Sequence, residues 1–141
     1  MDLGPAASAL VDYAESGFDT FDMADHYGSA ELIAGHARQK MQEHDSANRP
    51  SSQARFHTKW CPKPGEMTSQ KVRDGVLLSA ERLDMEQIDL MQFHWWNYEH
   101  PQYLDAMEGL WALKEEGIIR HLGLTNFDTD HLHLLLQELN L

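Results

Sequence analysis

Ile88–Phe93 (IDLMQF) is a short, mostly apolar run that ends against the polar residue His94, and it decides the predicted fold. A run of this length bounded by polar residues is typical of a buried strand. Helical patterns lie on both sides of it, over residues 68–83 and 101–116. Strands separated by helices cannot pair as tight hairpins, and they pair in parallel through right-handed crossovers. The segment therefore predicts an α/β protein.

The same alternation extends over the whole chain. Strands are predicted at residues 18–23, 56–60, 88–93 and 118–124, and helices at residues 6–16, 29–41, 68–83, 101–116 and from 128 onward. Pro101 suits a first helical position, and Asp128 suits an N-cap. Residues 44–54 (HDSANRPSSQA) are polar and rich in Pro and Ser, which predicts a loop. The residues alone fit either an open parallel sheet or part of a (β/α) barrel.

Composition limits the function classes. The 141 residues allow one modest domain, and 11 Lys and Arg against 23 Asp and Glu give a net charge of −12. Such an acidic surface argues against binding nucleic acid or an anionic membrane, and no apolar run approaches the ~20 residues of a membrane span. The single cysteine, Cys61, excludes a disulfide scaffold and fits a reducing cytosol. Because the start has no basic or long apolar region, no signal peptide is predicted, and we expect a cytoplasmic protein.

Polar residues stand where the predicted strands end. In parallel α/β folds the chemistry lies at the carboxyl ends of the strands. If these ends face one mouth, an aspartate, a lysine, a tyrosine and a histidine come together. The residues concerned are Asp22, shortly followed by Tyr27, then Lys59, His94 and the pair Thr125-Asn126.

This set is chemically suited to protonating a carbonyl oxygen. A tyrosine phenol titrates near pH ~10, and a neighbouring ammonium favours its ionisation. A carboxylate would hold the lysine charged, and a histidine would hydrogen-bond the same substrate oxygen. The nine histidines form no H-x-x-x-H motif and no Cys/His cluster in the sequence, and His131 and His133 point to different sides of a predicted helix. We therefore expect no metal site, and a hydride acceptor protonated by Tyr27 is the best match.

Five segments in order resemble the motifs of the aldo-keto reductases. Asp22–Gly28 (DMADHYG) resembles the D-x-A-x-x-Y-G signature, and Thr58–Trp60 (TKW) resembles the lysine strand of the family. Asp89–Trp95 (DLMQFHW) is similar to the D-L-x-x-x-H strand. Lys114–Arg120 (KEEGIIR) and Gly123–Phe127 (GLTNF) resemble the K-x-x-G-K-I-R and G-V-S-N-F segments. The match covers essentially the whole chain.

The resemblance implies catalytic roles for four residues. Tyr27 would be the general acid that protonates the carbonyl oxygen as hydride arrives from a nicotinamide. Lys59 would make the phenol more acidic, Asp22 would pair with Lys59, and His94 would orient the carbonyl of a small-molecule substrate.

The resemblance also implies NADP(H) as cofactor. Asp22, Thr125 and Asn126 would bind the cofactor. Asn126 and Thr125 would hydrogen-bond the nicotinamide carboxamide, and threonine keeps the hydroxyl of the serine usual in the family. Trp60, Trp95 and Trp96 stand next to these residues, where they would either line an apolar substrate pocket or cover the core.

The fold implied by the resemblance is a closed eight-stranded barrel of about 250 residues. Residues 1–141 offer four strands alternating with five helices, so we expect a partial (β/α)8 TIM barrel domain of this family. The absent half would carry the groups that hold the adenosine phosphates. The alternative is a catalytically inactive remnant that associates with other chains through its open sheet edges.

Overall fold

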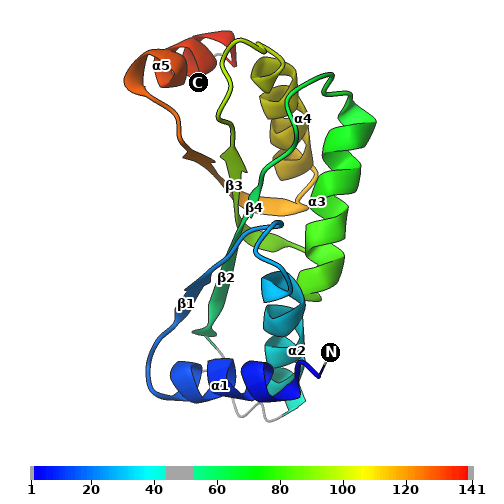
Figure 1. Cartoon of the computed structure of the whole chain (residues 1–141), viewed down its shortest axis with the longest axis vertical. Coiled ribbons are helices and arrows are strands. Elements are labelled where there is room, and N and C mark those ends of the chain that lie inside the picture. The colour runs from blue at the N-terminus through cyan, green and yellow to red at the C-terminus, as the bar shows by residue number, and fades with distance from the viewer. Residues whose placement is uncertain (1, 44–52, 140–141) are drawn as a thin grey trace.

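The structure is a computed structural model in which residues 2–43 and 53–139 are described. Four strands alternate with five helices in the predicted order (Figure 1). The strands are β1 (Thr20–Asp22), β2 (Arg55–Trp60), β3 (Ile88–His94) and β4 (Ile119–Thr125). The helices are α1 (Gly4–Glu15), α2 (Ala30–Glu43), α3 (Ser69–Leu83), α4 (Tyr103–Glu115) and α5 (Thr129–Glu138).

The order of the strands in the sheet distinguishes the two predicted architectures. The order is β1-β2-β3-β4, and every pair is parallel. An open doubly wound sheet reverses its strand order at a switch point, whereas each strand of a (β/α) barrel pairs with the next along the chain. The described sheet is therefore four consecutive strands of a barrel, with α2, α3 and α4 on one side of it (Figure 1).

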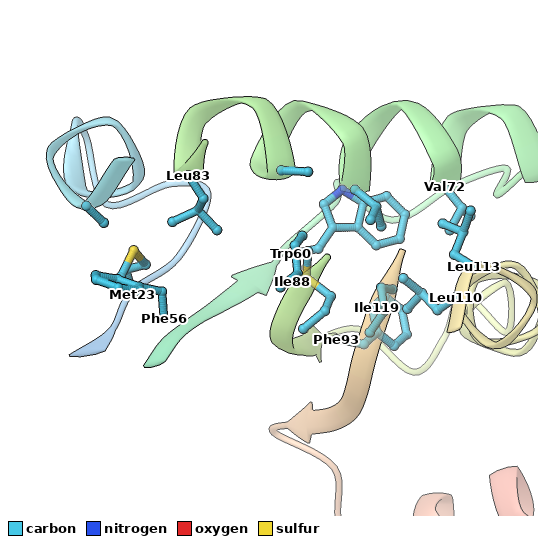
Figure 2. Packing of buried hydrophobic residues seen from close by; sticks show 14 of the residues in the cluster. Met23, Phe56, Trp60, Val72, Leu83, Ile88, Phe93, Leu110, Leu113 and Ile119 are labelled. Atoms are coloured by element: carbon cyan, nitrogen blue, oxygen red, sulfur yellow. The ribbon is translucent and has the colours of Figure 1, made fainter. Parts of the chain in front are cut away.

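The core lies between the sheet and these helices. Along β3 the buried residues Met91 and Phe93 alternate with the partly exposed Leu90 and Gln92, because successive side chains of a strand point to opposite faces. Trp60 stacks on Phe93 with the ring centroids 5.8 Å apart, and it lies beneath α3 in Figure 2.

A glycine lets α3 approach the sheet this closely. A Cβ atom placed on Gly75 of α3 would lie 2.3 Å from Nε1 of Trp60. Real Cβ contacts are essentially never this short, so a larger residue would require the Trp60 ring or the helix to shift.

Several predicted boundaries differ from the observed ones by one or two residues, and two of them show why. The first strand covers Thr20–Asp22 rather than residues 18–23, because Phe18 is 62% exposed and lies outside the ladder. The fourth helix begins at Tyr103 and not at Pro101, whose carbonyl accepts a turn hydrogen bond from the Leu104 N–H (3.1 Å). The predicted loop at residues 44–54 lies, as far as residue 52, outside the described residues.

A membrane span was not expected from the hydropathy pattern. Within residues 2–43 and 53–139, no helix is both long and apolar enough to cross a bilayer.

Candidate active site

Lys59 lies at the centre of the candidate site. It is on β2, is only 9% exposed, and its ammonium donates hydrogen bonds to the Asp22 carboxylate and to the Met23 carbonyl oxygen (2.9 Å). Asp22 is the last residue of β1, the neighbouring strand. A lysine is rarely buried unless its charge is paired, and Asp22 supplies that pairing. The predicted contact between Asp22 and Lys59 is therefore present.

Gln92 also belongs to the candidate site, although it was not predicted from the sequence. It lies beside Lys59 in the β2–β3 register. Its side-chain amide donates to Asp22 Oδ1 (2.8 Å) and its carbonyl oxygen accepts from the Thr125 hydroxyl (3.5 Å). Gln92 thus connects the ends of β1 and β4. The signal that could have found it is the two-residue period, which puts Gln92 on the same face as His94.

Tyr27 lies in the turn between β1 and α2. It is 53% exposed, and Lys59 Nζ is 5.3 Å from the centroid of its ring. The turn is closed by hydrogen bonds from the Tyr27 N–H to the Ala24 carbonyl oxygen and from the Ala30 N–H to the Tyr27 carbonyl oxygen, both 3.1 Å. Gly28 follows with φ +58°, which glycine adopts at low cost. The phenol is accessible to solvent and adjacent to a cation.

His94 extends the site to the end of β3. Its Nε2 lies 2.8 Å from Nδ2 of Asn126, and its Nδ1 is buried without a hydrogen-bond partner in the described part of the chain. Burial, followed by the neighbouring His26, lowers the pKa of His94 below its ordinary value. The ring therefore stays neutral at neutral pH.

Asn126 is held in an unusual backbone conformation. Its φ is +66°, a left-handed value that asparagine tolerates better than most residues. The Tyr98 hydroxyl donates to the Asn126 carbonyl oxygen (2.7 Å), and burial raises the pKa of Tyr98 to about 12. Tyr98 thus fixes the turn after β4 that presents the Asn126 amide to His94.

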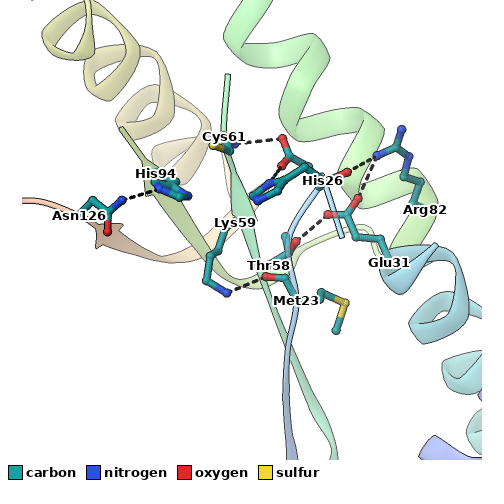
Figure 3. A network of polar contacts seen from close by, with 10 residues as sticks. Met23, His26, Glu31, Thr58, Lys59, Cys61, Arg82, His94 and Asn126 are labelled. Atoms are coloured by element: carbon teal, nitrogen blue, oxygen red, sulfur yellow. Dashed lines mark hydrogen bonds and ion pairs between the residues drawn. The ribbon is translucent and has the colours of Figure 1, made fainter. Parts of the chain in front are cut away.

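A buried network fastens the Tyr27 turn to the rest of the fold. Glu31, in the first turn of α2, is 2% exposed; it accepts from the Thr58 hydroxyl (2.6 Å) and from Arg82 Nη1 (3.2 Å). Arg82 also reaches the Asp25 carbonyl oxygen (3.4 Å). These contacts tie the turn to β2 and α3, as Figure 3 shows.

Two of the three predicted pocket tryptophans do not face the site, and that prediction is corrected. Trp60 packs against α3, because it follows Lys59 on β2 and successive side chains point to opposite faces. Trp95 is fully buried, and its indole N–H donates to the Asn97 carbonyl oxygen (2.8 Å). Trp96 alone of the three is half exposed, with its ring centroid 6.2 Å from that of His94.

A cluster of possible metal ligands also lies here, contrary to the expectation that no Cys/His cluster exists. One ligand atom each from His26, Cys61 and His94 lies within 4.8 Å of the other two. Asp25 accepts from the Cys61 N–H (3.0 Å) and contacts His26 Nδ1 (2.9 Å). Burial, with a smaller contribution from Asp25, raises the pKa of the Cys61 thiol. The three residues lie at or just after the ends of three different strands, so their sequence spacing has no metal-site signature.

Comparison with known proteins identifies the family. A model of the aldo/keto reductase family matches residues 2–140, and the chain belongs to this family of oxidoreductases. An aldo-keto reductase from Mycobacterium sp. (strain MCS) is 32% identical over 119 residues, which are 84% of this chain and 38% of that protein. Methylglyoxal reductase DkgA from Escherichia coli O157:H7 is 29% identical over 131 residues, which are 93% of this chain and 44% of that protein.

Solved structures agree on the fold. The crystal structure of Bombyx mori aldo-keto reductase in complex with NADP has a TM-score of 0.76 at 18% identity, covering 97% of this chain and 45% of that one. The chain thus spans less than half the length of each of these relatives. Its four strands correspond to part of their (β/α)8 barrel.

Proposed function

We propose that this chain carries the catalytic residues of an NADP-dependent reductase that converts a small aldehyde or ketone to an alcohol. The observation that carries the proposal is the buried Lys59 ammonium, bound to Asp22 and 5.3 Å from the centroid of the exposed Tyr27 ring. A phenol beside a buried cation, at the carboxyl ends of parallel strands, suits proton donation to a substrate oxygen.

Each residue has a defined part in this chemistry. When bound, NADPH would supply the hydride that the carbonyl carbon accepts. Tyr27 donates its phenolic proton to the carbonyl oxygen as negative charge develops there, which completes the alcohol. Lys59 stabilises the resulting phenolate, and Asp22 holds the ammonium charged and in place. Because Tyr27 is half exposed, solvent can return its proton after each turnover.

His94 is proposed to orient the carbonyl. Its ring lies 6.1 Å from that of His26, which in turn lies 4.9 Å from that of Tyr27, so the imidazole and the phenol border the same region. A hydrogen bond from His94 to the carbonyl oxygen would fix the oxygen for proton transfer, and positioning of this kind contributes substantially to rate.

The residues after β4 suit the nicotinamide. Asn126 is exposed and carries both a donor and an acceptor, the pair that a carboxamide requires. Thr125 adds a hydroxyl beside it, already in contact with Gln92. We propose that Thr125 and Asn126 hold the nicotinamide carboxamide, with Asp22 close by at the reacting end. The free thiol of Cys61 favours the cytoplasm as the compartment.

The substitution Tyr27→Phe tests the proposal in a polypeptide that carries the complete family barrel. Loss of the general acid should lower carbonyl reduction about 10²–10⁴-fold. NADPH binding should stay nearly intact, because the phenol is not proposed to hold the cofactor. Tyr13→Phe is the matched control, since Tyr13 is similarly exposed but lies on α1. Retention of turnover by the Tyr27→Phe enzyme would reject the assignment.

A second candidate function is association through the sheet edges. In the described sheet, β1 and β4 each have a neighbour on one side only, and such edges pair readily with other strands. Mixing the chain with the complementary half of a related barrel should then give a complex on size exclusion. Elution of the two halves as separate species would argue against this role.

A further inference from the structure

We propose that His26, Cys61 and His94 form a zinc-binding site at the mouth of the candidate active site. The three side chains come from the ends of three different segments: the β1–α2 turn, the residue after β2, and the last residue of β3. Figure 3 shows them gathered around one region, with Lys59 on its far side. Two imidazoles and one thiolate are ligands that Zn²⁺ binds readily in proteins, commonly with a water in the fourth position.

The distances suit this ion after a small adjustment. The candidate ligand atoms lie within 4.8 Å of one another. Bond lengths of about 2.0–2.3 Å put tetrahedral zinc ligands roughly 3.3–3.6 Å apart, so the atoms must approach by on the order of 1 Å. His26 can make this movement by side-chain rotation, because its side chain is 48% exposed on a turn.

Outer contacts already orient two of the ligands. Asp25 Oδ1 lies 2.9 Å from His26 Nδ1, and this arrangement leaves Nε2 of His26 for the metal. A carboxylate on the far nitrogen of a histidine is the usual support of a zinc ligand. The other oxygen of Asp25 accepts from the Cys61 N–H (3.0 Å), so a single carboxylate braces two ligands.

The third ligand has an atom without a partner. Nδ1 of His94 is buried and makes no hydrogen bond in the described residues, whereas Nε2 faces the Asn126 amide. If the amide turns its oxygen toward Nε2, that nitrogen carries the proton and Nδ1 is left to bind a metal. Binding therefore satisfies a polar atom that is otherwise unpaired.

The charges also balance. On binding, the Cys61 thiol releases its proton to the buffer and Sγ forms a bond to the metal. The thiolate and the adjacent Asp25 carboxylate then supply two negative charges to a dication. The Lys59 ammonium is already paired with Asp22. A metal bound here would occupy His94 and prevent it from binding the substrate carbonyl. This consequence rests on the proposed function, but the metal site itself does not.

Titration of the reduced 141-residue chain with Co²⁺, followed by displacement with Zn²⁺, tests the site without any activity assay. We expect one equivalent to give a thiolate-to-cobalt charge-transfer band and tetrahedral d–d bands, both lost when Zn²⁺ is added. Cys61→Ser should abolish the charge-transfer band. His26→Asn, a change on an exposed turn, should weaken binding at least tenfold with an unchanged far-UV circular dichroism spectrum.

Two further variants separate a built site from chance binding. Asp25→Asn should weaken the metal affinity about 10–100-fold, as loss of an outer-shell partner does in zinc proteins. His133→Asn, an exposed histidine on α5, should leave it unchanged. A cobalt spectrum without a thiolate band, or equal affinity in the parent chain and His26→Asn, would overturn the proposal.

Discussion

Lys59 and Asp22 form an ion pair, but their two side chains are exposed to solvent to different extents. The side chain of Lys59 is 11% exposed and that of Asp22 is 52% exposed. Removing one partner of a buried pair is costly only when the remaining charge cannot reach water. The two residues should therefore respond unequally to substitution.

We predict that Asp22→Asn destabilises the fold more than Lys59→Met does. The first change leaves the buried ammonium with neutral acceptors only, the Met23 carbonyl oxygen and the new amide oxygen, at a cost of about 1–3 kcal/mol, below the 3–5 kcal/mol of a fully buried pair. The second leaves a carboxylate that water and Gln92 still solvate, so the change should stay within about 1 kcal/mol. Urea midpoints of both variants measure the order.

The pair between Arg73 and Glu116 supplies the control for this measurement. Both side chains are partly exposed, at 36% and 46%, and exposed ion pairs contribute little. Arg73→Met should therefore shift the stability by less than about 0.5 kcal/mol. An equal loss in Asp22→Asn and Lys59→Met would contradict the unequal burial of the central pair.

Part of the candidate site was accessible from sequence, and the errors have two causes. Lys59 and His94 were found because polar residues at strand ends are informative. Trp60 and Trp95 were misplaced because adjacency in sequence was given more weight than strand alternation, which puts neighbouring side chains on opposite faces. His26 and Cys61 were missed as a pair because only the fold brings them together.

Helix α5 depends on its N-cap. Asp128 accepts from the His131 N–H (2.9 Å), which confirms the predicted cap, and His131 Nδ1 lies 2.8 Å from the same oxygen. The backbone hydrogen bond from His131, followed by the side-chain one, holds the pKa of Asp128 below its ordinary value. A carboxyl with a lowered pKa stabilises the fold above its ordinary pKa, and the contribution is lost as pH falls through the lowered value.

We predict that the stability difference between the parent chain and Asp128→Asn disappears in acid. Asparagine caps a helix about as well as aspartate but does not titrate, so the parent should be the more stable at neutral pH only. Urea midpoints of both chains at neutral and strongly acidic pH give the comparison. Asp128→Ala should be less stable than both at neutral pH, and a parent–Asn difference that does not change with pH would contradict the titration.

Boundaries between elements were harder to predict than the elements themselves. The helix and strand patterns predicted, in order, the nine elements found in residues 2–43 and 53–139. The first residues of β1 and α4 depend on which backbone groups near Phe18 and Pro101 find hydrogen-bond partners. Hydrophobic periodicity does not carry that information. The residues alone left the strand order open, because crossover connections fix the handedness but not the neighbour. The resemblance to the aldo-keto reductases predicted a partial barrel, which the consecutive strand order confirms.

At the scale of the whole molecule, the described sheet has four strands and carries Thr125 and Asn126, the residues proposed to hold the nicotinamide. In barrel enzymes the phosphate site commonly lies after strands seven and eight. We therefore predict that the 141-residue chain alone binds NADPH too weakly to saturate in the micromolar range.

Tryptophan fluorescence quenching measures this binding. Trp96 is the best placed reporter, because it is half exposed beside His94, while Trp60 and Trp95 are buried. The Trp96→Phe variant is the control. Quenching that the variant loses comes from binding near Trp96, whereas a signal decrease that remains includes light absorbed by the nucleotide. Saturable micromolar quenching that disappears in Trp96→Phe would show that these four strands hold the cofactor unaided.

The consecutive order of the strands affects how the chain can fold as it is synthesised. Each strand pairs with the one that precedes it, so β1 and β2 can form their ladder before β3 has left the ribosome, and each later strand adds to an existing edge. Because each described pairing joins two strands that follow one another along the chain, an emerging strand can pair with an edge that is already present, and that edge is covered early in synthesis.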